Sequence, residues 1–161
     1  MAILAVTGHM DLTDDTTDLV RSALSELLRR YADGNLVAVS CLAEGADSLF
    51  AEAALAADGR LVAVIPSRDY RRRHVHADYA PLFDHLLDVA DEVVVLPYES
   101  AGREAYEAAN AVLLERAERL VAVWNGEGPS GKGGGTADAV LAAREQGIPV
   151  DVVWPAGAAR R

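Results

Sequence analysis

The chain has 161 residues, of which 51% are hydrophobic, and it carries a formal net charge of −10 at pH 7. This length predicts one domain with ample apolar material for a core. Because nucleic acids and anionic membranes attract net basic surfaces, the acidic balance predicts that neither is a partner of this protein.

The single cysteine, Cys41, excludes an internal disulfide and favours a reducing, cytoplasmic location. Cys41 follows an apolar run, so we expect it to be a small buried hydrophobe rather than a nucleophile. No run approaches the ~20 apolar residues that a membrane-spanning helix needs. The first six residues lack a basic region and resemble a strand, so they are not expected to form a signal peptide.

Six short apolar runs alternate with helical patterns along the chain. The expected strands are Ile3–Thr7, Leu36–Ser40, Leu61–Pro66, Glu92–Leu96, Leu120–Trp124 and Val150–Trp154. The expected helices are Asp14–Tyr31, Asp47–Ala57, Tyr79–Val89, Glu104–Arg116 and Ala137–Gln146. Most of the apolar runs are continuous rather than alternating, which is typical of parallel strands covered on both faces. The pattern predicts a single domain over residues 1–161 with a Rossmann-like, three-layer α/β/α fold: a doubly wound, mainly parallel sheet of about six strands.

In such a sheet the ligand lies beyond the carboxyl ends of the strands, so the loops that follow the strands are the candidate site. After the first strand, Gly8 permits a tight exit and His9 would lie at the ligand edge, unless it is an ordinary loop histidine.

The loop after the second strand leads into a helix that starts near a glycine. The backbone N–H groups of Gly45, Ala46 and Asp47 predict a nest that accepts an anion, although Asp47 could also simply cap the helix. The adjacent Glu44 could bind ribose hydroxyls.

Three further side chains are candidates for a base or sugar pocket. Tyr70 could stack on a base, and Trp124 begins the long loop after the fifth strand. Asn110 stands on an apolar helix stripe, so its amide either bonds a neighbouring loop or reaches the ligand. No histidine, cysteine or carboxylate spacing suits a metal, and we expect no metal and no cofactor.

The glycine cluster after the fifth strand is the most informative segment. Gly133, Gly134 and Gly135 would let a ligand approach the backbone, and Thr136 leads into a helix whose free N–H groups attract anions. Lys132, the only lysine, could contact a phosphate or remain in solvent. No Ser or Thr follows it, so this is not the Walker phosphate loop. The cluster predicts a phosphate or nucleotide cradle.

Taken together, these loops resemble the SLOG superfamily, which groups the Smf domain of DNA processing protein A with the Lonely Guy (LOG) phosphoribohydrolases. Ser40–Asp47, with the residues up to Val64, looks like the Smf pattern S-G-L-A-x-G-I-D…A-L…G…A-V-L. Gly133–Thr136 looks like the end of the LOG motif P-G-G-x-G-T-x-x-E. The resemblance runs from Thr7 to Trp154 and implies a Rossmann-like fold that binds nucleotides or nucleotide-derived ligands, often as a homodimer.

The departures from the LOG motif bear on catalysis. Alignment puts Ala139 where LOG enzymes have their catalytic glutamate, and Ala109 where they have a motif arginine. Cleavage of an N-glycosidic bond needs a carboxylate, which only Asp138 or Glu44 could supply here. The resemblance therefore favours binding of a nucleotide-like small molecule, with a nucleoside 5′-monophosphate N-glycosidase using Asp138 or Glu44 as the alternative.

Overall fold

In the computed structural model, which describes residues 1–161, six strands form one entirely parallel sheet. The strands are β1 (Ala2–Gly8), β2 (Leu36–Ser40), β3 (Arg60–Ile65), β4 (Glu92–Val95), β5 (Arg119–Val123) and β6 (Val150–Val152). The helices are α1 (Asp14–Leu28), α2 (Ala46–Ala56), α3 (Tyr70–His74), α4 (Ala80–Val89), α5 (Arg103–Arg116) and α6 (Thr136–Glu145), and the short 3-10 helix η1 (Arg29–Tyr31) follows α1. The predicted doubly wound α/β fold is confirmed.

The sheet has the strand order β4-β3-β2-β1-β5-β6. The chain builds outward from β1 to β4 and then returns to the other side of β1 to form β5 and β6. The two halves therefore meet at β1 and β5, where Ala5 pairs with Leu120 and Gly8 pairs with Val123. At such a reversal the loops after the two strands turn to opposite faces of the sheet, which opens a crevice at their carboxyl ends.

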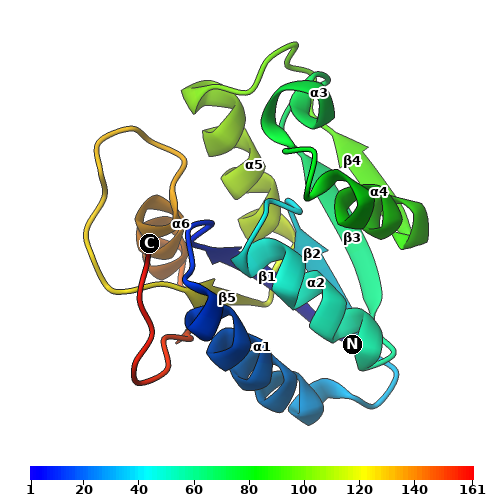
Figure 1. Ribbon diagram of the computed structural model, residues 1–161, viewed down its shortest axis with the longest axis vertical. Coiled ribbons are helices and arrows are strands. Elements are labelled where there is room, and N and C mark those ends of the chain that lie inside the picture. Colours follow the sequence, from blue (N-terminus) through cyan, green and yellow to red (C-terminus); the bar gives the residue numbers. More distant parts are fainter.

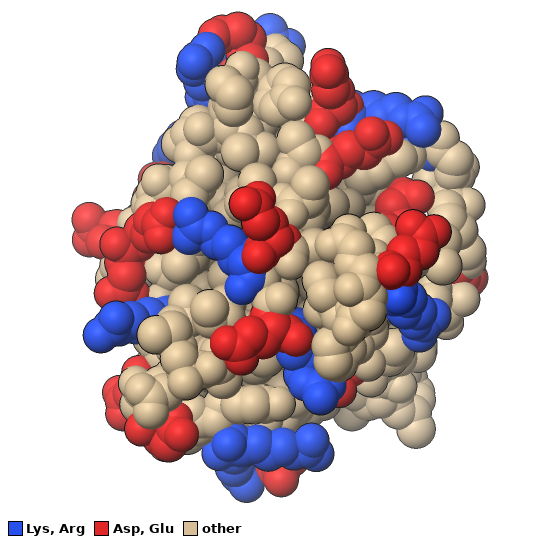
Figure 2. Space-filling view, turned by 180° about the vertical axis from the view of Figure 1, so that it is seen from behind, with Lys and Arg blue, Asp and Glu red and all other residues tan.

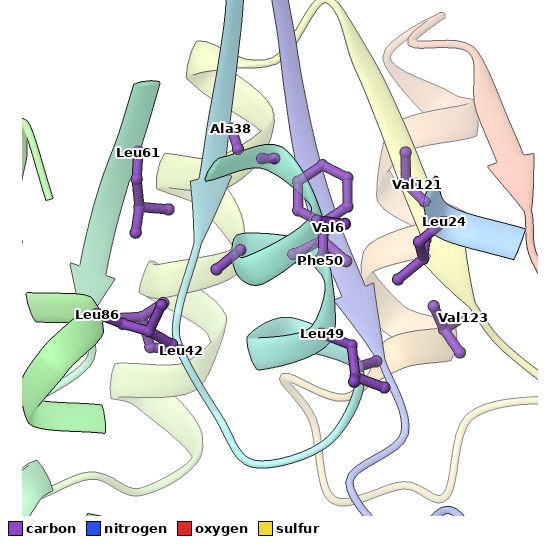
Figure 3. Close-up of a cluster of buried hydrophobic side chains, with 14 of the residues drawn as sticks. Val6, Leu24, Ala38, Leu42, Leu49, Phe50, Leu61, Leu86, Val121 and Val123 are labelled. Atoms are coloured by element: carbon purple, nitrogen blue, oxygen red, sulfur yellow. The ribbon is translucent and has the colours of Figure 1, made fainter. Parts of the chain in front are cut away.

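Helices cover both faces of the sheet, as the continuous apolar runs require. In Figure 1, α1, α2 and α4 lie in front of the sheet, and α5 and α6 lie behind it. The larger hydrophobic cluster, of 25 buried residues, fills the space under α1, α2 and α4. Figure 3 shows Phe50 of α2 among Val6, Val121 and other side chains of this cluster. The smaller cluster, of 13 residues, packs α5 and α6 against the other face.

Four of the helices begin and end within one residue of the predicted bounds, whereas α1 begins at the predicted Asp14 and ends at Leu28, with η1 covering the rest of the predicted range to Tyr31. Thr13 is the N-cap of α1, and its side chain accepts a hydrogen bond from the Thr16 N–H at 3.2 Å. The sixth helix, α3, lies between the expected strand Leu61–Pro66 and the expected helix Tyr79–Val89, where the sequence predicted neither a strand nor a helix.

The C-terminal segment returns to the front of the molecule and lies against the start of α1. Leu12 and Arg160 form an antiparallel bridge, and the Arg161 N–H donates to the Asp11 carbonyl at 2.7 Å. Arg160 Nε also pairs with Asp11 Oδ1 at 2.8 Å. These contacts bring Arg160 to the rim of the sheet edge where the loops leave the strands. None of the helices is both long and apolar enough to cross a membrane.

Candidate functional site

A cleft of about 1000 Å³ opens at the carboxyl ends of β1, β2, β3 and β5. This is the place that the strand order predicts for a ligand, and its volume suits one of nucleotide size. Twelve of the predicted site residues line it: Gly8, His9, Asp47, Tyr70, Asn110, Trp124, Lys132, Gly133, Gly134, Gly135, Thr136 and Asp138. The other three, Glu44, Gly45 and Ala46, do not.

The glycine-rich loop lies against α5 and forms one wall of the cleft; Figure 1 shows it extending outward between β5 and α6. Gly133 and Gly134 both adopt positive φ, at +77° and +71°. A Cβ on Gly134 would stand 2.5 Å from Cβ of Tyr106, and one on Gly133 would stand 2.6 Å from Nε of Arg103. Only glycine satisfies both the backbone angle and this close approach, so the glycines serve the packing of the loop on α5.

The N-terminus of α6 faces the cleft with part of its backbone unpaired. Gly135 is the N-cap, and its N–H donates to Oδ2 of Asp138 at 3.0 Å. The backbone N–H groups of Thr136 and Ala137 bond to no other group of the protein. Asp138 thus uses its carboxylate on its own helix, while two donors remain for a ligand.

The predicted anion nest at the start of α2 is not formed as expected. The Ala46 N–H donates to the carbonyl of His9 at 3.2 Å, so this donor is already used. Gly45, with φ +100°, lies so close to the neighbouring loop that a Cβ would be 2.8 Å from the His9 carbonyl oxygen. The glycine is there to let two backbone segments meet, and it does not contribute to the cleft wall.

Gly8 and His9 lie where the two halves of the sheet meet. A Cβ on Gly8 would stand 2.4 Å from Cβ of Ala46, so glycine allows α2 to pack directly on the end of β1. His9 is buried, and its Nε2 accepts the N–H of Asn125 at 3.1 Å. Burial, followed by the charge of Arg160, lowers the pKa of His9 and keeps the ring neutral, as this acceptor role requires. Trp154 packs edge-on against the ring at 5.6 Å.

Asp47 is the most unusual polar group of the cleft. It is the second residue of α2, its side chain does not cap the helix, and only 8% of the residue is exposed. Its Oδ1 is buried without any hydrogen-bond partner, and it is the only buried side-chain nitrogen or oxygen in this condition. Burial raises the pKa of its carboxyl to about 7, although the backbone amide of Ala43 opposes the shift.

Aromatic side chains gather at the Asp47 end of the cleft. Tyr70 stacks on His74 at 5.6 Å between ring centroids, and His74 meets the edge of Tyr106 at 6.3 Å. Tyr70 is 4% exposed, yet it lines the cleft and its hydroxyl forms no hydrogen bond within the protein. Sequence reasoning found Tyr70 and missed the role of the other two; Tyr106 could have been noticed, since it lies one helical turn before Asn110 on the same face of α5.

Asn110 and Trp124 also line the cleft, and both bond to the loop that follows β5. Nδ2 of Asn110 donates to the Gly135 carbonyl at 3.4 Å, and Nε1 of Trp124 donates to the Glu127 carbonyl at 2.9 Å. The Arg144 guanidinium lies 5.8 Å from the Trp124 ring centroid. Both predicted residues therefore have intramolecular partners as well as a face toward the cleft.

The cleft is balanced in charge within an acidic protein, because four acidic residues, Asp11, Asp47, Glu127 and Asp138, line it together with four basic ones. Four of the fifteen basic residues line it: Arg73, Arg103, Lys132 and Arg160. The three arginines form ion pairs with Asp69, Glu107 and Asp11, whereas Lys132 forms none. Figure 2 shows that basic and acidic residues are also interspersed on the rear surface of the molecule.

The carboxylates of the hydrolytic alternative are poorly placed. Glu44 is exposed and lies outside the cleft, and Asp138 is held by Gly135. The aligned positions Ala109 and Ala139 are 2% and 1% exposed and belong to the core under α5 and α6. Cys41 is half-buried at the cleft, where burial raises the pKa of its thiol well above the usual range. No group of three or more metal-ligating side chains is present.

No protein-family description and no curated protein matches this sequence. Solved structures do match. DNA processing protein A from Streptococcus pneumoniae superposes with a TM-score of 0.70 at 20% identity, over 98% of this chain and 52% of that one. The chain therefore spans about half the length of this relative. At this identity the likeness shows that the two chains share a fold. The resemblance seen in the sequence is confirmed at the level of the fold.

Two further structures share the fold of this chain. The molybdenum cofactor binding protein from the phototrophic bacterium Rippkaea orientalis matches with a TM-score of 0.60 at 16% identity, over 96% of this chain and 77% of that one. DNA processing protein A from Helicobacter pylori matches with a TM-score of 0.67 at 16% identity, over 99% of this chain and 68% of that one.

The Helicobacter pylori structure corrects one expectation from the sequence. That protein, which shares the fold of this chain, binds single-stranded DNA, so net charge does not set nucleic acid aside as a partner. The prediction from net charge was wrong because total charge sums over every face, whereas a ligand meets one local surface. Here as many basic as acidic side chains line the cleft, and the acidic excess of the chain lies elsewhere.

Proposed function

We propose that this protein binds a nucleotide, or a small molecule derived from one, in the cleft at the carboxyl ends of β1, β2, β3 and β5. The observation that carries the proposal is the pair of unbonded N–H groups of Thr136 and Ala137 at the cleft. Helix N-termini of this kind bind phosphate because their donors and the helix dipole both favour an anion.

The two ends of the cleft suit the two ends of a nucleotide. The glycine-rich loop supplies backbone donors and the unpaired cation Lys132, which suit a phosphate. The aromatic group of Tyr70, His74 and Tyr106 suits a base or another flat ring. The molybdenum cofactor binding protein of the same fold supports a small-molecule ligand.

Binding, rather than hydrolysis, is the activity that the contacts favour. The N-glycosidase alternative needs a carboxylate free to act on the sugar. Asp138 is engaged by Gly135, and Glu44 is exposed outside the cleft. A single domain over residues 1–161, a cytoplasmic location and a homodimeric assembly remain predictions alongside this proposal.

The test is thermal shift and calorimetry with the four common nucleoside 5′-monophosphates and with a single-stranded oligonucleotide, while release of free base is followed. A mononucleotide that raises the unfolding temperature without base release supports the proposal. Lys132→Ala should weaken that binding about three- to tenfold, and the exposed Arg30→Ala is the control. Base release that is lost in Asp138→Asn would instead establish the enzyme. The absence of any shift would refute the proposal.

A further inference from the structure

The buried Oδ1 of Asp47 has no hydrogen-bond partner, and the phosphate end of the cleft does not explain why. Buried polar atoms are nearly always hydrogen-bonded, since leaving one without a partner costs free energy. Oδ1 of Asp47 has none, and the residue lines the cleft rather than the hydrophobic core alone. A ligand that enters the cleft can supply the hydrogen bond that this oxygen lacks.

The groups around Asp47 determine which kind of ligand can bond to its carboxylate. No lysine or arginine forms an ion pair with it, so it is not neutralised from within the protein. The titratable groups that face it are Cys41 after β2, Tyr70 on α3 and Tyr79 before α4. The pKa of each of these three is raised, so all are neutral at pH 7. The Tyr79 hydroxyl is already bonded to the Leu42 carbonyl at 2.6 Å.

A ligand group that satisfies a carboxylate must donate hydrogen bonds, and a carboxylate can accept two parallel ones. The neighbouring Tyr70, His74 and Tyr106 rings favour a flat aromatic ligand at the same end. The chemical group that combines both features is a heteroaromatic ring with an N–H beside an exocyclic NH₂.

We propose that Asp47 selects the ligand by accepting both hydrogen bonds of this amide–amine edge, which guanine and pterin rings share. The proposal rests on the proposed nucleotide-binding function and assigns the ring that this function recognises. The phosphate or other anionic tail would then extend toward Lys132 and the N-terminus of α6. Adenine and cytosine present a donor beside an acceptor, so they do not complement the ionised carboxylate.

The test compares guanosine, inosine, adenosine and xanthosine 5′-monophosphates, with pterin-6-carboxylate as a second source of the same edge. We expect the guanosine nucleotide to bind about tenfold more tightly than the inosine nucleotide, which lacks the NH₂, and more tightly still than the adenosine nucleotide. Because the ionised carboxylate is the binding form, the affinity for the guanosine nucleotide should rise by about tenfold more than that for the adenosine nucleotide between pH 6 and pH 8.

Asp47→Asn provides a gain as well as a loss, so a folding defect cannot mimic the result. Asparagine presents one acceptor and one donor, which complements the N–H and oxygen of xanthine. The variant should bind the guanosine nucleotide about tenfold more weakly and prefer the xanthosine nucleotide, whereas the exposed Asp78→Asn should behave as wild type.

The outcomes separate this proposal from the one on which it rests. Equal affinity of the wild type for guanosine and adenosine nucleotides would overturn the role of Asp47 and leave nucleotide binding intact. Unchanged guanosine nucleotide or pterin binding by Asp47→Asn would overturn it as well. If only the pterin binds and Asp47→Asn abolishes its binding, the edge recognition stands and the pterin is its source. If no compound binds, both proposals fail.

Discussion

Burial of Asp47 without a partner predicts that removing its charge stabilises the empty protein. The carboxyl has a pKa of about 7 in the fold, against 3.8 for an ordinary aspartate. This difference of about 3 pH units, at ~1.4 kcal/mol per unit, corresponds to ~4 kcal/mol. Since small domains have stabilities of only ~5–15 kcal/mol, one side chain would carry a large cost.

The sign of the effect follows from proton binding. The folded state holds the Asp47 proton more tightly than the unfolded chain, so protonation favours folding at low pH. The cost is close to zero below about pH 4, grows as the pH rises toward 7, and is complete above about pH 7. Asp47→Asn has no such titration, so the stability difference between variant and wild type should increase by ~4 kcal/mol over this range.

Urea unfolding of both proteins at pH 4 and pH 8, without ligand, measures this difference directly. Any constant cost of a buried asparagine amide cancels when the two pH values are compared. The exposed Asp78→Asn serves as the matched control and should gain no comparable stability at pH 8. A difference that is independent of pH, or a variant that becomes relatively less stable at pH 8, would show that the carboxyl is satisfied in solution.

Three further predictions follow from the packing. Gly134→Ala should weaken nucleotide binding and lower the stability by ~2–4 kcal/mol, because the added Cβ would collide with Tyr106. The control Gly131→Ala, at φ +86° and in open space, should cost only the ~1 kcal/mol of backbone strain. Equal effects of the two variants in calorimetry and urea unfolding would rule out the contact. His9→Ala should cost ~2 kcal/mol and speed hydrogen exchange of the Asn125 amide, and an unchanged exchange rate would argue against the His9 acceptor. Phe50→Ala, in the fully buried core, should cost ~3–5 kcal/mol in the same urea assay, and a loss below 1 kcal/mol would contradict its packing.

Most of the fold could be predicted because its signals are local. Continuous apolar runs marked the strands, and caps such as Thr13 marked the helix starts. The short helix α3 was missed because five residues are too few to show a helical period, and the preceding Pro66 and Ser67 favoured a loop.

The site was harder to predict because its details depend on contacts between distant segments. The sequence identified Gly45 as special, but its φ of +100° serves an approach to His9 that only the folded chain creates. The sequence predicted Asp47 to belong to an anion nest or to cap its helix, and nothing in its neighbours along the chain indicates that its Oδ1 is buried and unbonded. Arg73 lies on the short helix α3, which brings it to the cleft.

The residues around His9 tolerate substitution less well than the exposed loop that follows Asn125. The His9 carbonyl accepts a hydrogen bond from α2, and its ring accepts one from Asn125 at the start of the long loop. Few substitutions should therefore be tolerated at this base of the cleft. Beyond Asn125 the loop includes Gly126, Gly128 and Gly131, around which a Cβ would meet nothing within 4 Å. Insertions, deletions and substitutions over residues 126–131 should therefore be tolerated without a change in the structure around His9. Engineering or evolution can thus change the size of the ligand that the cleft accepts by altering residues 126–131 alone.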